Sequence, residues 1–227
     1  MSQFSILVLG DGKNELGVPD DKEVPREDVL VFAGDMPPLP CLVSRLLGEP
    51  REVRFFCGSF KKYHAVARGL SSTLAGKVKA AVLYARARGH RGVVIVIDRD
   101  RDRKRNSLRL LQEGRDDMAC LPGPACALGV AVETFDAWMI ADGLAVGDAG
   151  GKAAESHASA EKLDGKEGSG LHPKDLARRA LGEGLTEKYK LVARRVRLEE
   201  LERLCCDGFK PFAEEVRKRL GPVVASG

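Results

Sequence analysis

The sequence lacks several features that would assign it to a class at once. One of its 227 residues is tryptophan and only 5% are aromatic. No apolar run approaches the roughly 20 residues that span a bilayer. The first nine residues show neither a charged n-region nor a cleavage site, so no secretory signal is indicated. These absences predict a cytoplasmic protein that does not contact a membrane.

The number of cysteines and the net charge do not by themselves indicate a class of protein. The positions of the cysteines and of the charged residues are more informative. None of the six cysteines forms a C-x-x-C pair or has histidines at a matching spacing, which argues against a zinc site and a disulfide framework. We expect them to be reduced and mostly buried. The net charge is only +4, but basic residues cluster at 99–105, 178–179 and 188–197. Such clustering is typical of proteins that bind a polyanion.

The most informative stretch is Gly92–Asp102, which reads GVVIVIDRDRD. Its five consecutive β-branched residues, Val93–Ile97, predict a buried strand. Three acids follow at every second position, Asp98, Asp100 and Asp102, where ligands bind in open α/β sheets. Carboxylates that converge there favour a hard cation such as Mg²⁺ or Mn²⁺. The alternative is a solvated loop of alternating Asp and Arg, which explains Asp102 best.

A second acid-bearing loop follows the first predicted strand, Phe4–Leu9. Residues 10–17 read GDGKNELG, and the glycines predict a tight turn at the strand end. Leu7 and Asn14 replace residues that a Walker phosphate loop requires, and Glu15 replaces a glycine of the dinucleotide fingerprint. What remains is Glu15, an acid just past a strand like Asp98. Taken alone, an acid in this position is more often an exposed loop residue than a ligand.

The rest of the chain predicts an α/β protein with a mostly parallel sheet flanked by helices. A helix over 72–89 leads directly into the strand at 93–97, which is a parallel crossover. Further short strands are expected at 118–122 and 128–133, and a helix over 133–142 that carries Asp136 and the tryptophan. We expect an α/β domain over 1–144, a flexible surface connection over 145–171, and a helical extension over 172–227 packed on the first domain. Gly221 and Pro222 are expected to stop its last helix.

These pieces together resemble the Toprim domain of topoisomerases, primases and overcoming-lysogenization-defect nucleases. More closely, they resemble the small bacterial Toprim-like proteins of the domain-of-unknown-function 4276 family. The resemblance is carried by segments that span most of the chain, namely 10–15, 94–100, 132–142 (VETFDAWMIAD), 189–190 and 208–212. Two positions depart from the family pattern. Leu9 replaces an acid before the first glycine, and Asp136 replaces a glutamate.

The resemblance implies a metal-dependent nuclease that hydrolyses phosphodiesters of DNA or RNA. Glu15, Asp98 and Asp100 would hold Mg²⁺ or Mn²⁺ and act in catalysis, with Asp102 and Asp136 as further ligands. Because such proteins are often encoded beside ATPases in phage-defence systems, it also implies an ATPase partner. The basic residues beside the acids would attract the polyanion, namely Arg99, Arg101, Arg103, Lys104 and Arg105.

Two other functions compete with the nuclease. A haloacid-dehalogenase-type phosphatase also uses Asp-x-Asp after an apolar strand, but small residues follow its motif, whereas Arg101-Asp102-Arg103 follow here. The second alternative is a regulatory module that binds nucleic acid or an ATPase without cleaving anything. The departures at Leu9 and Asp136 favour this module.

Overall fold

The computed structural model of the chain describes residues 4–17, 29–31, 35–50, 53–61, 72–99, 106–163 and 165–226. These residues form an α/β fold with a five-stranded sheet in the order β2-β3-β1-β4-β5. Its strands are β1 (Ser5–Gly10), β2 (Val29–Val31), β3 (Arg54–Ser59), β4 (Gly92–Asp98) and β5 (Ala125–Ala131). The pairs β1–β3, β1–β4 and β4–β5 are parallel, whereas the edge strand β2 is antiparallel to β3. The predicted mostly parallel sheet is therefore confirmed.

Side chains alternate between the two faces of the sheet and build two apolar clusters. In β4, Val94 and Val96 point into the cluster shared with α1 and α9. Val93, Ile95 and Ile97 point into the opposite cluster, shared with α2 and α3. This period of two explains the unbroken apolar run in the sequence, because both faces of the strand are covered.

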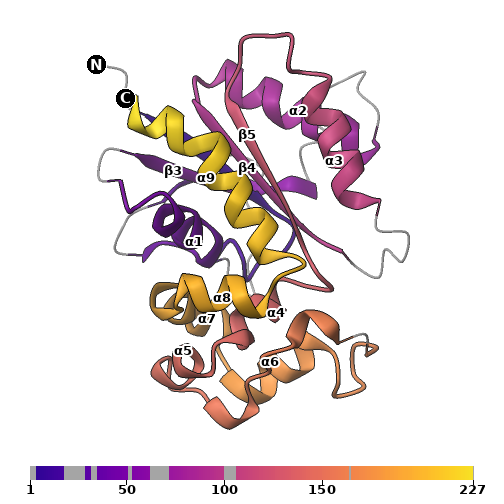
Figure 1. The fold of residues 1–227 in the computed structure, drawn as a ribbon, viewed down its shortest axis with the longest axis vertical. Helices are drawn as coiled ribbons and strands as arrows, with labels where there is room; N and C mark the ends of the chain where they lie inside the picture. The colour runs from indigo at the N-terminus through magenta and orange to yellow at the C-terminus, as the bar shows by residue number, and fades with distance from the viewer. Residues whose placement is uncertain are drawn as a thin grey trace.

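Helices cover both faces and one end of the sheet. Figure 1 shows α9 lying across β4 and β5, with α2 and α3 on the other side. The helices α4 to α8 gather beyond one end of the strands. The helices are α1 (Pro38–Leu46), α2 (Leu74–Ala87), α3 (Ser107–Asp116), α4 (Asp136–Ala141), α5 (Gly143–Asp148), α6 (Pro173–Leu181), α7 (Leu185–Arg195), α8 (Leu198–Leu204) and α9 (Phe209–Ala225).

The topology places a switch point between β1 and β4. The helix that follows β1 is α1, which packs on one face, whereas the helix that follows β4 is α3, on the other. Adjacent parallel strands whose connections leave toward opposite faces open a crevice at their carboxyl ends, where ligands of α/β proteins bind. Asp98 ends β4, and Glu15 lies in the loop that follows β1.

Two sequence expectations are wrong. Residues 118–121 form consecutive turns after α3, with Met118 N donating to Arg115 O at 2.9 Å, so no strand forms at 118–122. The strand expected at 128–133 does form, as β5, but it begins at Ala125 and pairs with β4 from that residue. Helix α9 continues through Pro222 to Ala225. Pro222 lies in the last turn of α9, so few helical residues follow the site that it disrupts.

The expected surface connection over 145–171 also contributes to the core. Val146, Ala149 and Ala160 are buried in the same apolar cluster as the C-terminal helices. Helix α5 begins where the Asp142 side chain accepts a hydrogen bond from Leu144 N at 3.1 Å. The burial of this segment could not be predicted from its composition, because small residues can be buried at close contacts without an apolar periodicity.

Two simpler expectations can also be compared with the structure. All six cysteines are free, and four of them are buried. Within the described residues, no helix is both long enough and apolar enough to cross a bilayer.

Candidate functional site

Glu15 is folded back onto the loop that follows β1. Asp11 N donates to Glu15 Oε2 at 2.9 Å, and Gly12 N–H donates to the same carboxylate. A Cβ at Gly10 would lie 2.5 Å from Glu15 Oε2, and one at Gly12 would lie 3.0 Å from Oε1. The two glycines therefore provide the space that the carboxylate occupies. Although it is a loop residue, Glu15 is only 3% exposed.

Glu15 interacts electrostatically with Asp98, the acid that ends β4. Burial raises the pKa of Glu15 well above its usual value, and the negative charge of Asp98 raises it further. Asp11 adds a smaller effect in the same direction, against the two backbone hydrogen bonds. Two carboxylates whose charges oppose ionisation in this way fit the donor set of a hard divalent cation.

Asp98 is the last residue of β4 and lies on the same strand face as Val94 and Val96. Its Oδ1 accepts a hydrogen bond from Phe135 N at 2.8 Å, which connects it to the start of α4. The other predicted residues of this loop, Asp100, Arg101, Asp102, Arg103, Lys104 and Arg105, lie outside the described residues.

Arg99 has a partner inside the protein. Its guanidinium forms an ion pair and a hydrogen bond with Glu133, and both side chains are largely buried. Glu133 follows β5 and adopts φ = 60°, a left-handed conformation that is uncommon outside glycine. Arg99 therefore joins the ends of β4 and β5. The sequence predicted it as a contact for nucleic acid and did not predict this pairing.

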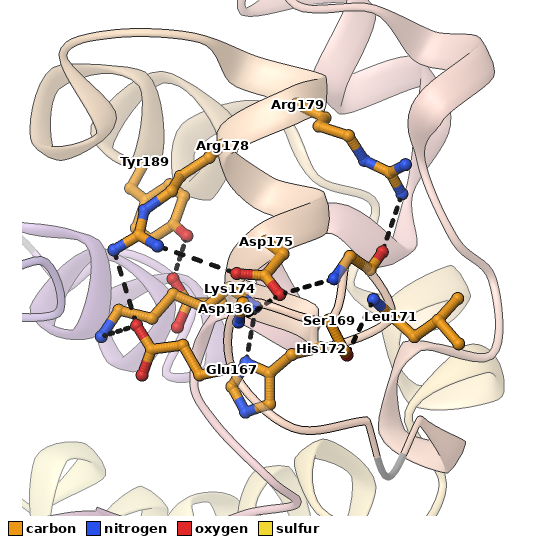
Figure 2. A network of polar contacts seen from close by, with 12 residues as sticks. Asp136, Glu167, Ser169, Leu171, His172, Lys174, Asp175, Arg178, Arg179 and Tyr189 are labelled. Atoms are coloured by element: carbon orange, nitrogen blue, oxygen red, sulfur yellow. Dashed lines mark hydrogen bonds and ion pairs between the residues drawn. The ribbon is translucent and has the colours of Figure 1, made fainter.

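Asp136 lies at the start of α4 and accepts a hydrogen bond from the hydroxyl of Tyr189 in α7. Burial raises the pKa of Tyr189 well above its usual value, and the charge of Asp136 raises it further. The tyrosine therefore stays protonated and donates. Figure 2 shows this pair beside the start of α6, where Glu167 and Lys174 meet.

A polar cavity of about 210 Å³ joins these elements. It lies beyond the ends of β4 and β5, and α6 contributes to its wall. The lining residues are Asp98, Glu133, Thr134, Asp136, Glu167, His172 and Lys174. Of the predicted site residues, Asp98 and Asp136 therefore share one cavity.

Sequence reasoning missed several residues around this site. Asp11 donates its backbone N–H to Glu15, but in the sequence it is only one residue of a glycine-rich turn. For His172 the sequence offers no histidine or cysteine at ligand spacing, so it predicts no role. His172 is nevertheless 6% exposed, and its Nδ1 accepts from Lys174 N at 3.2 Å. Thr134 lies within the acid-rich segment, and only the fold shows that its side chain is buried there.

The described residues contain no group of three or more His, Cys, Asp or Glu side chains arranged to hold a metal ion. The predicted third ligand, Asp100, lies outside them. The metal site therefore stays a prediction.

Comparisons with known proteins add no relative. No protein-family model, curated protein or solved structure matches the chain.

Proposed function

We propose that the chain is a divalent-metal-dependent nuclease that hydrolyses nucleic-acid phosphodiesters. The observation that carries the proposal is the pair Glu15 and Asp98. The two carboxylates follow adjacent parallel strands at a switch point, and the charge of Asp98 raises the pKa of the buried Glu15 carboxyl. Burying the Glu15 carboxylate under the influence of a second negative charge is costly unless a cation offsets both charges.

Glu15 and Asp98 would hold Mg²⁺ or Mn²⁺, with Asp100 as the third ligand and Asp102 or Asp136 as further ones. When bound, the cation would polarise the scissile phosphate, stabilise the leaving oxygen and lower the pKa of the attacking water. The protein's own contribution is to position the carboxylates: hydrogen bonds from Asp11 N and Gly12 N orient Glu15, and one from Phe135 N orients Asp98.

Basic residues beside the acids would attract the polyanion. Arg101, Arg103, Lys104 and Arg105 retain this proposed role, and they would make binding weaken as salt increases. Arg99 would instead act through Glu133. An ATPase partner and a cytoplasmic location remain part of the proposal on the resemblance alone.

The test is cleavage of labelled DNA and RNA with Mg²⁺, with Mn²⁺ and with chelator. We expect metal-dependent cleavage by the wild type and loss of at least about a hundredfold in Glu15→Gln and Asp98→Asn, the scale of losing a positioned catalytic group. Glu214→Gln is the matched control, because Glu214 is exposed on α9. Activity that survives both substitutions would overturn the assignment.

A second measurement separates metal binding from turnover. Mg²⁺ or Mn²⁺ should raise the melting temperature of the wild type and of Glu214→Gln, but not of Glu15→Gln or Asp98→Asn. Nucleic-acid binding without metal dependence or cleavage would favour the regulatory module. Hydrolysis of a small phosphomonoester that is lost in Asp98→Asn would favour the phosphatase.

A further inference from the structure

We propose that the cavity between β5 and α6 binds the sugar of a ribonucleotide next to the cleaved bond, with Thr134 recognising its 2′-hydroxyl. The inference rests on the proposed nuclease function and names its substrate class as RNA. It is carried by the residues that line the cavity, by its size and by one buried hydroxyl.

The cavity wall favours a neutral ligand that both donates and accepts hydrogen bonds. Four carboxylates line it, so a phosphate would be repelled. All four already have a donor or cation: Asp98 has Phe135 N, Glu133 has Arg99, Asp136 has Tyr189, and Glu167 has Lys174 at 3.2 Å. Each carboxylate has about four acceptor sites, and the hydroxyls of a sugar can donate to those that remain.

The start of α6 adds a histidine to the cavity lining. Because the backbone N–H of Lys174 donates to His172 Nδ1, that nitrogen carries no proton, and the neutral ring carries its proton on Nε2. Figure 2 shows this second ring nitrogen directed away from Lys174. With Nδ1 accepting, Nε2 is the nitrogen of His172 that can donate to a ligand.

The size of the cavity fits one sugar. Its volume of about 210 Å³ is far above the roughly 10–15 Å³ that a single water needs. It is below the roughly 300–1,000 Å³ of pockets that enclose a drug-sized ligand. Because Asp98 lies in the same wall, a sugar bound here would be next to the proposed reaction centre.

Thr134 is the residue that most strongly indicates a bound ligand. Its side chain is 7% exposed, and among the described residues its hydroxyl oxygen is buried without a hydrogen-bond partner. The neighbouring Glu133 holds a left-handed backbone conformation, and such strained positions concentrate at binding sites. A ribose 2′-hydroxyl can both donate to and accept from Thr134, whereas deoxyribose leaves it unpaired.

The experiment compares binding of RNA and DNA strands of identical sequence, measured by fluorescence anisotropy in Ca²⁺ or chelator so that cleavage is not required. Thr134→Val removes only the hydroxyl, and Thr134→Ser keeps it. We expect the wild type and Thr134→Ser to bind RNA at least about tenfold more tightly than DNA, the effect of one buried hydrogen bond. Thr134→Val should bring the ratio close to one.

Folding is controlled in the same series. Because the Thr134 hydroxyl has no partner, Thr134→Val should leave the melting temperature unchanged or raised. Thr186→Val is the matched stability comparison and should lower it, since Thr186 Oγ1 donates to Asn14 Oδ1 at 3.0 Å. If Thr134→Val did not fold, RNAs with single 2′-deoxy substitutions would test the wild type alone.

Equal binding of RNA and DNA by the wild type would overturn the inference, as would an unchanged ratio in Thr134→Val. The two proposals fail separately. A nuclease without preference for RNA contradicts only the sugar site, whereas selective RNA binding without cleavage contradicts only the nuclease.

Discussion

Replacing Glu161 by glutamine should destabilise the protein, because one buried carboxylate connects three parts of the chain. Glu161 Oε1 accepts from Trp138 Nε1 at 2.9 Å and from Phe209 N at 3.2 Å. Its Oε2 accepts from Asp207 N at 3.0 Å and from Gly208 N at 3.2 Å. The residue is 4% exposed. It thereby joins α4 to the start of α9.

The size of the effect follows from these four donors. A glutamine amide offers one oxygen, so its NH₂ group faces two of the N–H groups and leaves them unpaired. Each buried unpaired group costs about 1–3 kcal/mol. Loss of the buried negative charge offsets part of this cost, so we expect a net loss of about 2–4 kcal/mol in unfolding free energy. For a chain of this length that lowers the melting temperature by roughly 4–16 °C.

The loss should depend on pH in a defined direction. Burial raises the pKa of Glu161 above its usual 4.5, although the hydrogen bonds from Trp138 and the three backbone N–H groups lower it. An acid whose pKa is higher in the folded state stabilises most at low pH, and that contribution falls as pH rises through the folded-state pKa. Glutamine does not titrate. The difference between wild type and Glu161→Gln should therefore be largest below about pH 4.5 and shrink above it.

Trp138 provides the assay, because it is the only tryptophan in the chain. Its ring is buried and stacks on Phe212 at 5.5 Å, so its fluorescence follows the same packing that Glu161 supports. Urea unfolding would be followed by fluorescence and circular dichroism, with the exposed Glu155→Gln as control. A loss under about 0.5 kcal/mol, the range of ordinary surface substitutions, would refute the reasoning. So would a difference that grows as pH rises.

Three further predictions concern the strand ends. Without metal, Glu15→Gln should stabilise the protein increasingly as pH rises above about 4.5, because burial raises the pKa of Glu15 in the wild type. Melting temperatures of both proteins in chelator, from pH 4.5 to 8, test whether the variant gains stability with pH. Gly10→Ala should remove metal-dependent stabilisation by displacing the Glu15 carboxylate, whereas Gly221→Ala, which meets nothing within 4 Å, should leave it intact. Arg99→Ala should lower the free energy of unfolding by about 3–5 kcal/mol, because it leaves Glu133 buried and unpaired. The double variant with Glu133→Gln should recover part of that loss. Chemical denaturation measures both, and an unchanged stability in Arg99→Ala would contradict the pairing.

Local patterns in the chain were sufficient for most of the fold. The apolar run at 93–97 and the helical periodicity at 72–89 predict β4 and α2, and their order predicts parallel strands. These signals are local, since apolar periodicity and strand length depend on neighbouring residues. The same reasoning missed the burial of residues within 145–171, because small residues become core only when another element covers them.

For the candidate site, the sequence by itself determined which acids follow strands, since a strand end and the carboxylate after it are visible in the order of residues. It could not determine that the charge of Asp98 acts on a buried Glu15, that Arg99 pairs with Glu133, or that His172 and Thr134 share a cavity with Asp98. These residues are far apart in the chain, and only the strand order and the packing of α6 bring them together. Only the tertiary structure determines these contacts, because burial, charge interaction and an unpaired hydroxyl depend on which residues lie beside one another in space.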